Sequence, residues 1–292
     1  MPHATYDPLG RRWVLLAPER AGRGVPDPPP DAPDPEPCDF CGGREDRTPP
    51  ETAAIRPDGT APDSPGWRVR AVPNLYPATT VHEVVVHTPD HTTRFEELGR
   101  DHRADVLRLY RQRLRAIDVA SAVVVFNRGR RAGASRTHPH GQLFGLDVVP
   151  PVLEREAEAL AGGCVVCDLA HDDGHRAGIE GTAVVAVHPA PKVAHEVLVV
   201  PPCAPRFEDA DDPTLEDAAE ALGAALATLR RAFGDALPLN VALHTAPRDT
   251  GAFHWHLHVY PRTAHWAGLE MGAEIPIVDA DPLLTAARLR ES

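Results

Sequence analysis

The 292-residue chain has a single lysine, Lys192, and its 42 acidic residues give it a net charge of -12 at pH 7. A negative surface opposes the counterion release that drives most non-specific binding to nucleic acids, so we expect no DNA or RNA partner. No run approaches the roughly 20 apolar residues of a membrane span, and the N-terminus lacks the charged-then-apolar pattern of a signal peptide. We therefore expect a cytoplasmic protein with no membrane contact.

Cysteine is also scarce, and four of the five cysteines form two Cys-x-x-Cys pairs, at Cys38 and Cys41 and at Cys164 and Cys167. Disulfides are rare in reducing compartments, so these pairs indicate metal sites. The two-residue spacing lets both thiolates of one tight turn reach the same tetrahedral ion. Pairs of buried thiols are the alternative interpretation.

The order of expected elements repeats along the chain, after a proline-rich segment, residues 25–37, that is typical of an extended arm. In each half, β-like runs precede an amphipathic helix, a further strand and a histidine run. The segments are 67–72, 82–87, 94–117, 122–126 and 138–142 in the first half, and 195–199, 215–233, 239–244 and 254–258 in the second. The alignment matches His82-Glu83 with His195-Glu196.

This repetition predicts an α+β fold made of two repeats, each an antiparallel sheet with a helix. The repeats would span residues 1–150 and 151–292. Coincidence among short β-rich segments is the alternative.

The repetition also nominates the remaining metal ligands. His138 and His254 open the two histidine runs, and aligning Arg94-Phe95 on Arg206-Phe207 places His91 opposite Cys203. Each site then has four protein ligands and no open position, which is typical of structural zinc, so we expect two zinc ions. The predicted sets are Cys38, Cys41, His91 and His138, and Cys164, Cys167, Cys203 and His254. His91 as a solvated loop residue and Cys203 as a small buried apolar residue are the alternatives.

The run His138-Pro139-His140-Gly141-Gln142 places three polar side chains on one face of a strand, since residues two apart point to the same side. A neutral imidazole is a good nucleophile toward phosphorus near pH 7, and a glutamine amide can donate to phosphoryl oxygens as charge develops. We predict that His140 is the nucleophile and that Gln142 assists it. Gly141 would leave room for a phosphate to approach the backbone.

At these residues the chain resembles the galactose-1-phosphate uridylyltransferase family of the histidine-triad superfamily, which implies that both repeats are histidine-triad-like. Further landmarks extend the resemblance over nearly the whole chain: residues 13–23, the Cys38 pair, residues 74–77, residues 89–91 and residues 256–261. The resemblance implies ping-pong transfer of a nucleotidyl group from a nucleoside diphosphate sugar, through His140, to a sugar 1-phosphate. Family members often form dimers, which implies a homodimer here.

The resemblance also assigns ligand contacts and a different metal set. It implies nucleotide or phosphate contacts at Arg20, Arg23, Asn74, Asn127, Ser135 and Gln142. In many members a second metal is bound by a glutamate and three histidines, which here would be Glu156, His244, His256 and His258. We favour the cysteine set over this one.

Some positions depart from the usual family pattern. Leu75 and Leu269 replace a polar and an aromatic residue, and Arg136-Thr137 replaces Asn-Pro and adds a cation near the phosphate. The paired Cys-x-x-Cys motifs and Asn74-Leu75-Tyr76-Pro77 are similar to a subgroup acting on ADP-glucose, where phosphate can be the acceptor. We expect a UDP-sugar as the donor, and an ADP-sugar is the second candidate.

Two other functions stay open. His256 could be the nucleophile, as in simpler histidine-triad hydrolases, or the chain could be a non-catalytic, zinc-stabilised nucleotide-binding protein. The Gly-Gln pair after His140 argues against both alternatives. The second histidine run lacks such a pair, and a non-catalytic protein does not need one.

Overall fold

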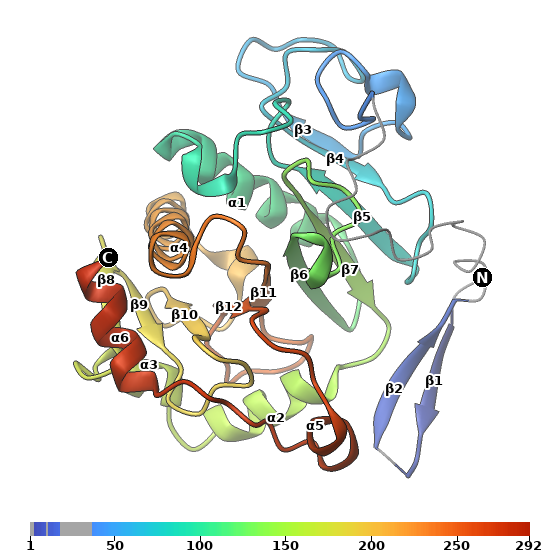
Figure 1. Cartoon of the computed structure of the whole chain (residues 1–292). Helices are drawn as coiled ribbons and strands as arrows, with labels where there is room; N and C mark the ends of the chain where they lie inside the picture. Colours follow the sequence, from blue (N-terminus) through green and yellow to red (C-terminus); the bar gives the residue numbers. More distant parts are fainter. Residues whose placement is uncertain (1–2, 10, 18–36) are drawn as a thin grey trace.

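The computed structural model describes residues 3–9, 11–17 and 37–292 (Figure 1). The proline-rich arm up to residue 36 and the predicted contacts Arg20 and Arg23 lie outside this part of the chain. The strands are β1 (His3–Asp7), β2 (Arg12–Leu16), β3 (Ala53–Ile55), β4 (Val69–Pro73), β5 (Val81–Val86), β6 (Ser121–Arg128), β7 (His140–Leu146), β8 (Arg176–Glu180), β9 (Ala183–Val187), β10 (Val197–Val200), β11 (Leu239–His244) and β12 (His256–Pro261). The helices are η2 (Glu45–Arg47), η3 (Phe95–Glu97), α1 (Arg100–Ala116), η4 (Arg130–Ala132), α2 (Pro151–Leu160), α3 (Val165–Ala170), η5 (Phe207–Asp209), α4 (Asp212–Phe233), α5 (Gly268–Ala273) and α6 (Pro282–Glu291).

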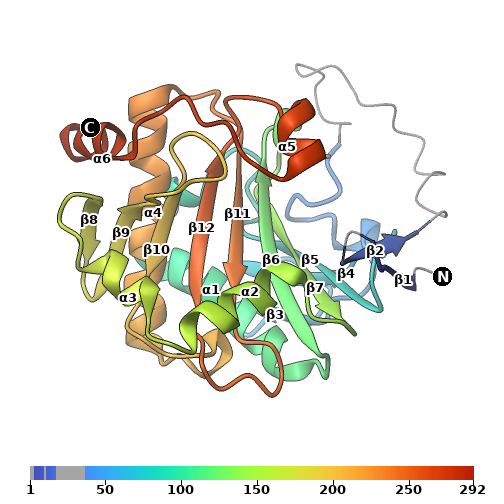
Figure 2. The ribbon, with the colours of Figure 1, turned by 90° about the horizontal axis from the view of Figure 1, so that it is seen from below.

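One ten-stranded antiparallel sheet runs through the molecule in the order β3-β4-β5-β7-β6-β11-β12-β10-β9-β8. Figure 2 shows its second half and the central strands side by side. The order in the second half mirrors that in the first, and the two halves meet where β6 pairs with β11. The expected α+β class with antiparallel sheet and helices is therefore confirmed, and the division at residue 150 stays a prediction.

The strand register corrects the alignment of the two halves by one residue. Val84 pairs with Gln142 on β7, whereas the residue opposite His258 on β12 is Leu198. The structural equivalent of His82 is therefore Glu196 and not His195. His195, two residues before β10 begins, has a left-handed conformation with φ of 63°.

Helices α1 and α4 lie side by side on one face of the sheet and cover its core (Figure 1). The expected helix over 94–117 is split, because a separate turn, η3, precedes Gly99 and α1. Helix α4 is capped by Asp211, whose carboxylate accepts from the N–H of Thr214 at 2.9 Å. Its buried side is rich in alanine, which lets the helix approach the strands closely.

The opposite face of the sheet is covered in its second half by α2 and α3. Leu153 and Val166 of these helices pack against Leu198 and Val200 of β10. The first half of this face carries the histidine run of β7 and leaves room for a cavity. One face of the sheet therefore packs against the main core, and the other face carries the polar side chains.

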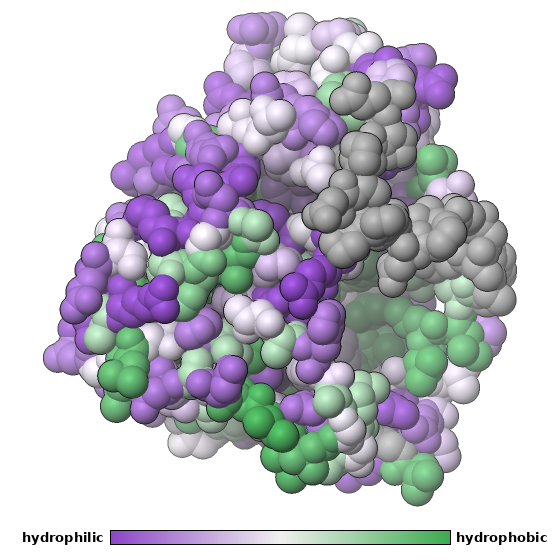
Figure 3. All heavy atoms as spheres, in the orientation of Figure 1, coloured by the Kyte–Doolittle hydropathy of each residue, from purple (hydrophilic) through white to green (hydrophobic). Residues whose placement is uncertain are grey.

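The β1–β2 hairpin stands apart from the large sheet, and hydrophobic side chains gather at the surface over the hairpin and α5 (Figure 3). Its exposed residues include Trp13, Val14, Leu15 and Leu16, and those near α5 include Trp266, Leu269 and Met271. Among the described residues, no helix has the length and apolar character needed to cross a membrane.

Candidate functional site

His140 begins β7 and is 8% exposed, on the face of the sheet away from α1 and α4. Its Nδ1 lies 2.7 Å from the carbonyl oxygen of His138. A carbonyl oxygen only accepts, so Nδ1 carries the hydrogen and Nε2 keeps its lone pair in the neutral imidazole. The local backbone thus fixes the tautomer that a nucleophile needs.

A cavity of about 370 Å³ lies against His140. The predicted contacts that the structure describes all line it, so one residue converges on the same space as three others that follow it by at least 53 positions. These are Asn74, Asn127, Ser135 and Gln142. Arg136 and Asp39 also line the cavity, and the Arg136 guanidinium donates to the Asp39 carboxylate at 3.1 Å. The arrangement suits a phosphorylated ligand, and the role of each side chain remains a prediction.

The expected role of Gly141 is wrong in one respect. A Cβ on Gly141 would lie closer than 3.0 Å to the hydroxyl of Tyr110 and to the ring of Phe126. Both side chains belong to the core beneath the sheet, on the opposite face from His140. Glycine is therefore needed here because α1 packs closely, and not because a phosphate approaches the backbone.

The first predicted metal set comes together at the end of β7. The Nε2–H of His138 donates to the carbonyl of Thr88 at 2.8 Å, so its Nδ1 lone pair faces Cys38 Sγ and Cys41 Sγ, each 3.8 Å away. His91 Nδ1 lies 3.6 Å from Cys41 Sγ and 3.3 Å from His138 Nδ1. The four ligand atoms lie within 4.8 Å of one another, as a tetrahedral ion requires.

The second set repeats this geometry. His254 donates from Nε2 to the carbonyl of Pro201 at 2.9 Å, and its Nδ1 lies 3.2 Å from Cys164 Sγ and 3.5 Å from Cys167 Sγ. Cys203 Sγ is 3.9 Å from Cys164 Sγ. The structure thus brings together all eight predicted ligands in two groups.

A third group, Glu156, His244, His256 and His258, also forms, so the two proposed second sites do not exclude each other. His256 directs Nδ1 at the carbonyl of His254 at 2.7 Å, and His258 directs Nδ1 at Glu196 Oε1 at 2.8 Å. When Glu196, whose pKa burial raises to about 7, is ionised, both Nδ1–H groups donate and the Nε2 lone pairs face each other at 3.0 Å. Two lone pairs repel, and a cation between them removes the conflict.

The pKa shifts agree with these donor sets. Burial lowers the pKa of His138 and of His256 to about 4, which keeps both imidazoles neutral with a lone pair near pH 7. Burial, with Cys38 nearby, raises the pKa of Cys41 to about 11, and burial with a hydrogen bond from the Cys167 thiol to Cys164 raises that of Cys167 to about 12. Without a cation both groups would be thiols, so the fit to a metal rests on the metal stabilising the thiolates.

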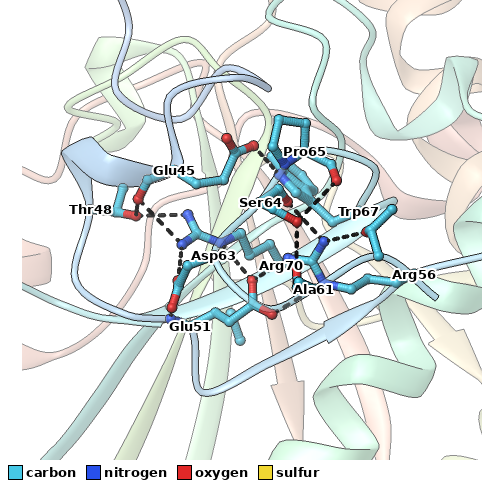
Figure 4. Close-up of polar contacts among 12 residues, drawn as sticks. Glu45, Thr48, Glu51, Arg56, Ala61, Asp63, Ser64, Pro65, Trp67 and Arg70 are labelled. Carbon is cyan, nitrogen blue, oxygen red and sulfur yellow. Dashed lines mark hydrogen bonds and ion pairs between the residues drawn. The ribbon is translucent and has the colours of Figure 1, made fainter. Parts of the chain in front are cut away.

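A buried ionic network holds the loop after the first Cys-x-x-Cys pair against β4 (Figure 4). Arg70, with its side chain 3% exposed, donates to Glu51 at 3.0 Å, to Asp63 at 2.7 Å and to Thr48 at 2.7 Å. Glu45 accepts from the indole of Trp67 at 2.6 Å. Because Thr48 also lines the cavity, the network fixes one wall of the site.

Motif reasoning missed two side chains beside the cavity. His82 Nε2 lies 2.9 Å from Gln142 Oε1, and Asn240 Nδ2 lies 2.7 Å from Asn127 Oδ1. The pairing of β5 with β7 and of β6 with β11 produces both contacts. Only the strand order could have revealed them, because neither residue belongs to the histidine run.

Comparisons with known proteins bear on this geometry. A profile described as galactose-1-phosphate uridyl transferase, N-terminal domain, matches residues 69–150. An ADP-glucose phosphorylase from Arabidopsis thaliana is 28% identical over 99% of this chain and 93% of its own length. The galactose-1-phosphate uridylyltransferase of Haemophilus influenzae is 24% identical over 89% of this chain and 84% of its own.

The resemblance expected from the sequence is confirmed, since the chain is similar to galactose-1-phosphate uridylyltransferases and to an ADP-glucose phosphorylase.

Solved structures agree with this similarity. The ADP-glucose phosphorylase from Arabidopsis thaliana with bound ADP-glucose superposes with a TM-score of 0.81, at 26% identity, and covers 100% of this chain and 99% of its own. A structure of uridylyltransferase gives a TM-score of 0.82 at 26% identity, covering 100% and 98%. The protein is thus a nucleotidyltransferase-type enzyme, and the expectation of uridylyltransferase-like function is confirmed at that level.

Proposed function

We propose that the protein transfers a nucleotidyl group from a nucleoside diphosphate sugar through a covalent intermediate on His140. The observation that carries this proposal is the hydrogen bond from His140 Nδ1 to the carbonyl of His138, which leaves Nε2 as a nucleophile beside a cavity lined by amide donors. His256 has the same tautomer, but its Nε2 faces His258 within a metal-type cluster. We therefore assign the chemistry to the first histidine run.

The reaction has two displacements at the α-phosphorus. In the first, His140 Nε2 forms a P–N bond while the bond from phosphorus to the bridging oxygen breaks, and sugar 1-phosphate leaves with that electron pair. In the second, a phosphate oxygen of the acceptor forms a P–O bond and the P–N bond breaks, which returns the lone pair to Nε2. Asn127 and Gln142 donate to the phosphoryl oxygens as negative charge develops in both steps.

Two donors stay in the proposal, UDP-glucose with a hexose 1-phosphate acceptor and ADP-glucose with inorganic phosphate. The sequence motifs place the uridylyl reaction first. The adenylyl reaction gains support from the relative matched over 99% of this chain, an ADP-glucose phosphorylase, and from the similar structure with bound ADP-glucose. We put ADP-glucose forward as the donor to test first.

We also propose that zinc binds the two cysteine groups, in a structural role. Four protein ligands in each leave no position for a reacting water. The group of Glu156, His244, His256 and His258 is proposed as a third cation site, for the lone-pair reason given above. When bound, these ions stabilise the fold, and the phosphoryl chemistry uses only side chains and backbone.

The test of the proposed function is a labelling experiment. Protein is incubated with ADP-glucose or UDP-glucose labelled at the α-phosphate, then quenched, and the expected result is an acid-labile adduct on His140. A chase with phosphate or with galactose 1-phosphate then shows which acceptor discharges it. No adduct with either donor, or an adduct that persists in folded His140→Asn and disappears in His256→Asn, would contradict the proposal.

Homodimer formation stays a prediction. The exposed apolar side chains of β2 and α5 offer a surface for it, since apolar patches on soluble proteins commonly mark contacts. Sedimentation of the purified protein should give about twice the mass of one chain, and a single-chain mass would rule the dimer out.

A further inference from the structure

We propose that His82 and Asn240 are positioning residues that fix the carboxamides of Gln142 and Asn127 in one orientation, with both oxygens turned away from the ligand and both NH₂ groups presented to it. The inference rests on the proposed nucleotidyl transfer and concerns how the donors of that site are oriented. Each orientation follows from a backbone group whose hydrogen-bonding character is chemically fixed.

The first chain of contacts begins at the backbone of Ala78. Its N–H donates to His82 Nδ1 at 3.0 Å, so Nδ1 must carry the lone pair, and the hydrogen of the neutral imidazole is on Nε2. Nε2 lies 2.9 Å from Gln142 Oε1, and a donor at that position requires an oxygen to face it. The Gln142 amide nitrogen is thereby left as the group that contacts a ligand.

The geometry around His82 supports this assignment. Its ring stacks on Phe144, with centroids 4.2 Å apart and planes 29° apart, and His82 is 4% exposed. The ring therefore has little freedom to turn. Asn74 Nδ2 also lies 3.2 Å from Nε2, but both groups carry hydrogens, so this contact is not a hydrogen bond and the Nε2–H donates to Gln142 Oε1. Asn74 Oδ1 is already used by the N–H of Tyr76 at 2.8 Å.

The second chain of contacts begins at the carbonyl of Ala132, which can only accept. Asn240 Nδ2 donates to it at 2.7 Å, and the other hydrogen of the same NH₂ points to Asn127 Oδ1 at 2.7 Å. Turning the Asn240 amide would place its oxygen against that carbonyl. Arg262 donates to Asn240 Oδ1 at 3.4 Å and favours the same orientation. Asn127 therefore also turns its oxygen away and keeps its NH₂ for the ligand.

Comparison of the two halves strengthens the inference. Glu196 is the structural equivalent of His82, and it accepts from His258, the equivalent of Gln142. The same strand position thus orients the side chain on the neighbouring strand in both halves. A carboxylate there directs a histidine lone pair toward a cation, whereas an imidazole N–H there directs an amide toward an anion. The chemistry at this one position matches the charge of the ligand in each half.

The experiment is a double-mutant cycle on adduct formation with ADP-glucose or UDP-glucose. His82→Phe keeps the ring stack on Phe144 and removes the N–H, and we expect the labelling rate at saturating donor to fall about tenfold or more with a smaller change in KM. In a Gln142→Ala background the same change should have little further effect, because the amide to be oriented is gone. His82→Gln, which restores a donor, should recover part of the rate.

The matched control is His195→Phe. His195 also stacks on a phenylalanine, Phe233, with centroids 4.0 Å apart, but it belongs to the second half and contacts Thr285 rather than a carboxamide. Its labelling rate should stay near that of the wild type. For the contacts that begin at the carbonyl of Ala132, the effect of Asn240→Leu should be non-additive with Asn127→Ala and additive with Gln142→Ala.

The outcomes separate this inference from the proposed function. A labelled wild type with additive losses in both cycles, or with an unchanged rate in His82→Phe, overturns the positioning role alone. If the wild type is not labelled by either donor, the proposed function fails, and AMP binding measured by calorimetry becomes the readout. The positioning role then requires the same non-additivity in AMP affinity, and absence of AMP binding overturns it too.

Discussion

His256 and His258 hold their Nε2 atoms 3.0 Å apart while each directs its Nδ1 at an oxygen acceptor. We expect a cation to lie between them, in addition to the ions at the two cysteine groups. Elemental analysis of the purified protein should therefore find about three metal ions per chain. His244→Ala should lose one ion, while His175→Asn, a histidine outside the three groups, should lose none. Two ions in both the wild type and His244→Ala would contradict the third site.

The exposed ligand Cys203 gives a sharper test of the second cysteine group. Cys203→Ala should lose one zinc ion and lower the midpoint of thermal unfolding, because structural zinc contributes directly to folding free energy. Cys203→His should keep the ion, since the first group has a histidine, His91, in the corresponding place. Retention of zinc in Cys203→Ala would remove Cys203 from the site.

Gly141→Ala should destabilise the protein by at least about 1–3 kcal/mol, the usual cost of overpacking a core. The added methyl group would meet Tyr110 and Phe126 beneath the sheet. Urea unfolding measures the loss, and Tyr110→Phe in the same chain should restore part of it. Gly251→Ala, where a Cβ meets nothing within 4 Å, is the control. An unaffected Gly141→Ala protein would show that the helix is not packed as described.

Glu51→Ala should cost about 3–5 kcal/mol in the free energy of unfolding, the range found when one partner of a buried ion pair is removed. Glu51 accepts from Arg56 at 2.6 Å and from Arg70 at 3.0 Å, and all three side chains are less than 10% exposed. By contrast, Asp118→Ala breaks a pair with Arg248 in which both side chains are well exposed, and it should cost about 1 kcal/mol or less. Equal losses in the two variants would contradict a structural role for the network.

Much of the site could be predicted from sequence because its parts recur. The two Cys-x-x-Cys pairs and the two histidine runs stand at matching places, and this alone was enough to pair His91 with Cys203 as ligands. The strand over 239–244 and the helix ending at residue 233 also follow directly from apolar spacing. Repetition supplies long-range information that a single motif lacks.

The features that could not be predicted depend on the register of the strands and on which face of the sheet a residue occupies. The strand pairings make Glu196 the equivalent of His82, so a motif alignment pairs His82 with the wrong residue, His195. Successive residues of β7 face opposite sides of the sheet, so Gly141 faces Tyr110 in the core whereas His140 faces the cavity. Helices α2 and α3 were not predicted, and with 10 and 6 residues they are too short for apolar spacing to distinguish a helix with certainty.

The join between β6 and β11 has a consequence for how the chain is made. Strand β6 pairs with β7 on one side and with β11, residues 239–244, on the other. During synthesis, β6 must be followed by more than a hundred further residues before β11 exists. Until then its valine-rich edge exposes unpaired N–H and C=O groups, a state that invites association with other chains. A chain truncated near residue 150 should therefore aggregate. In the full-length protein, the late pairing of β6 with β11 should limit the refolding rate.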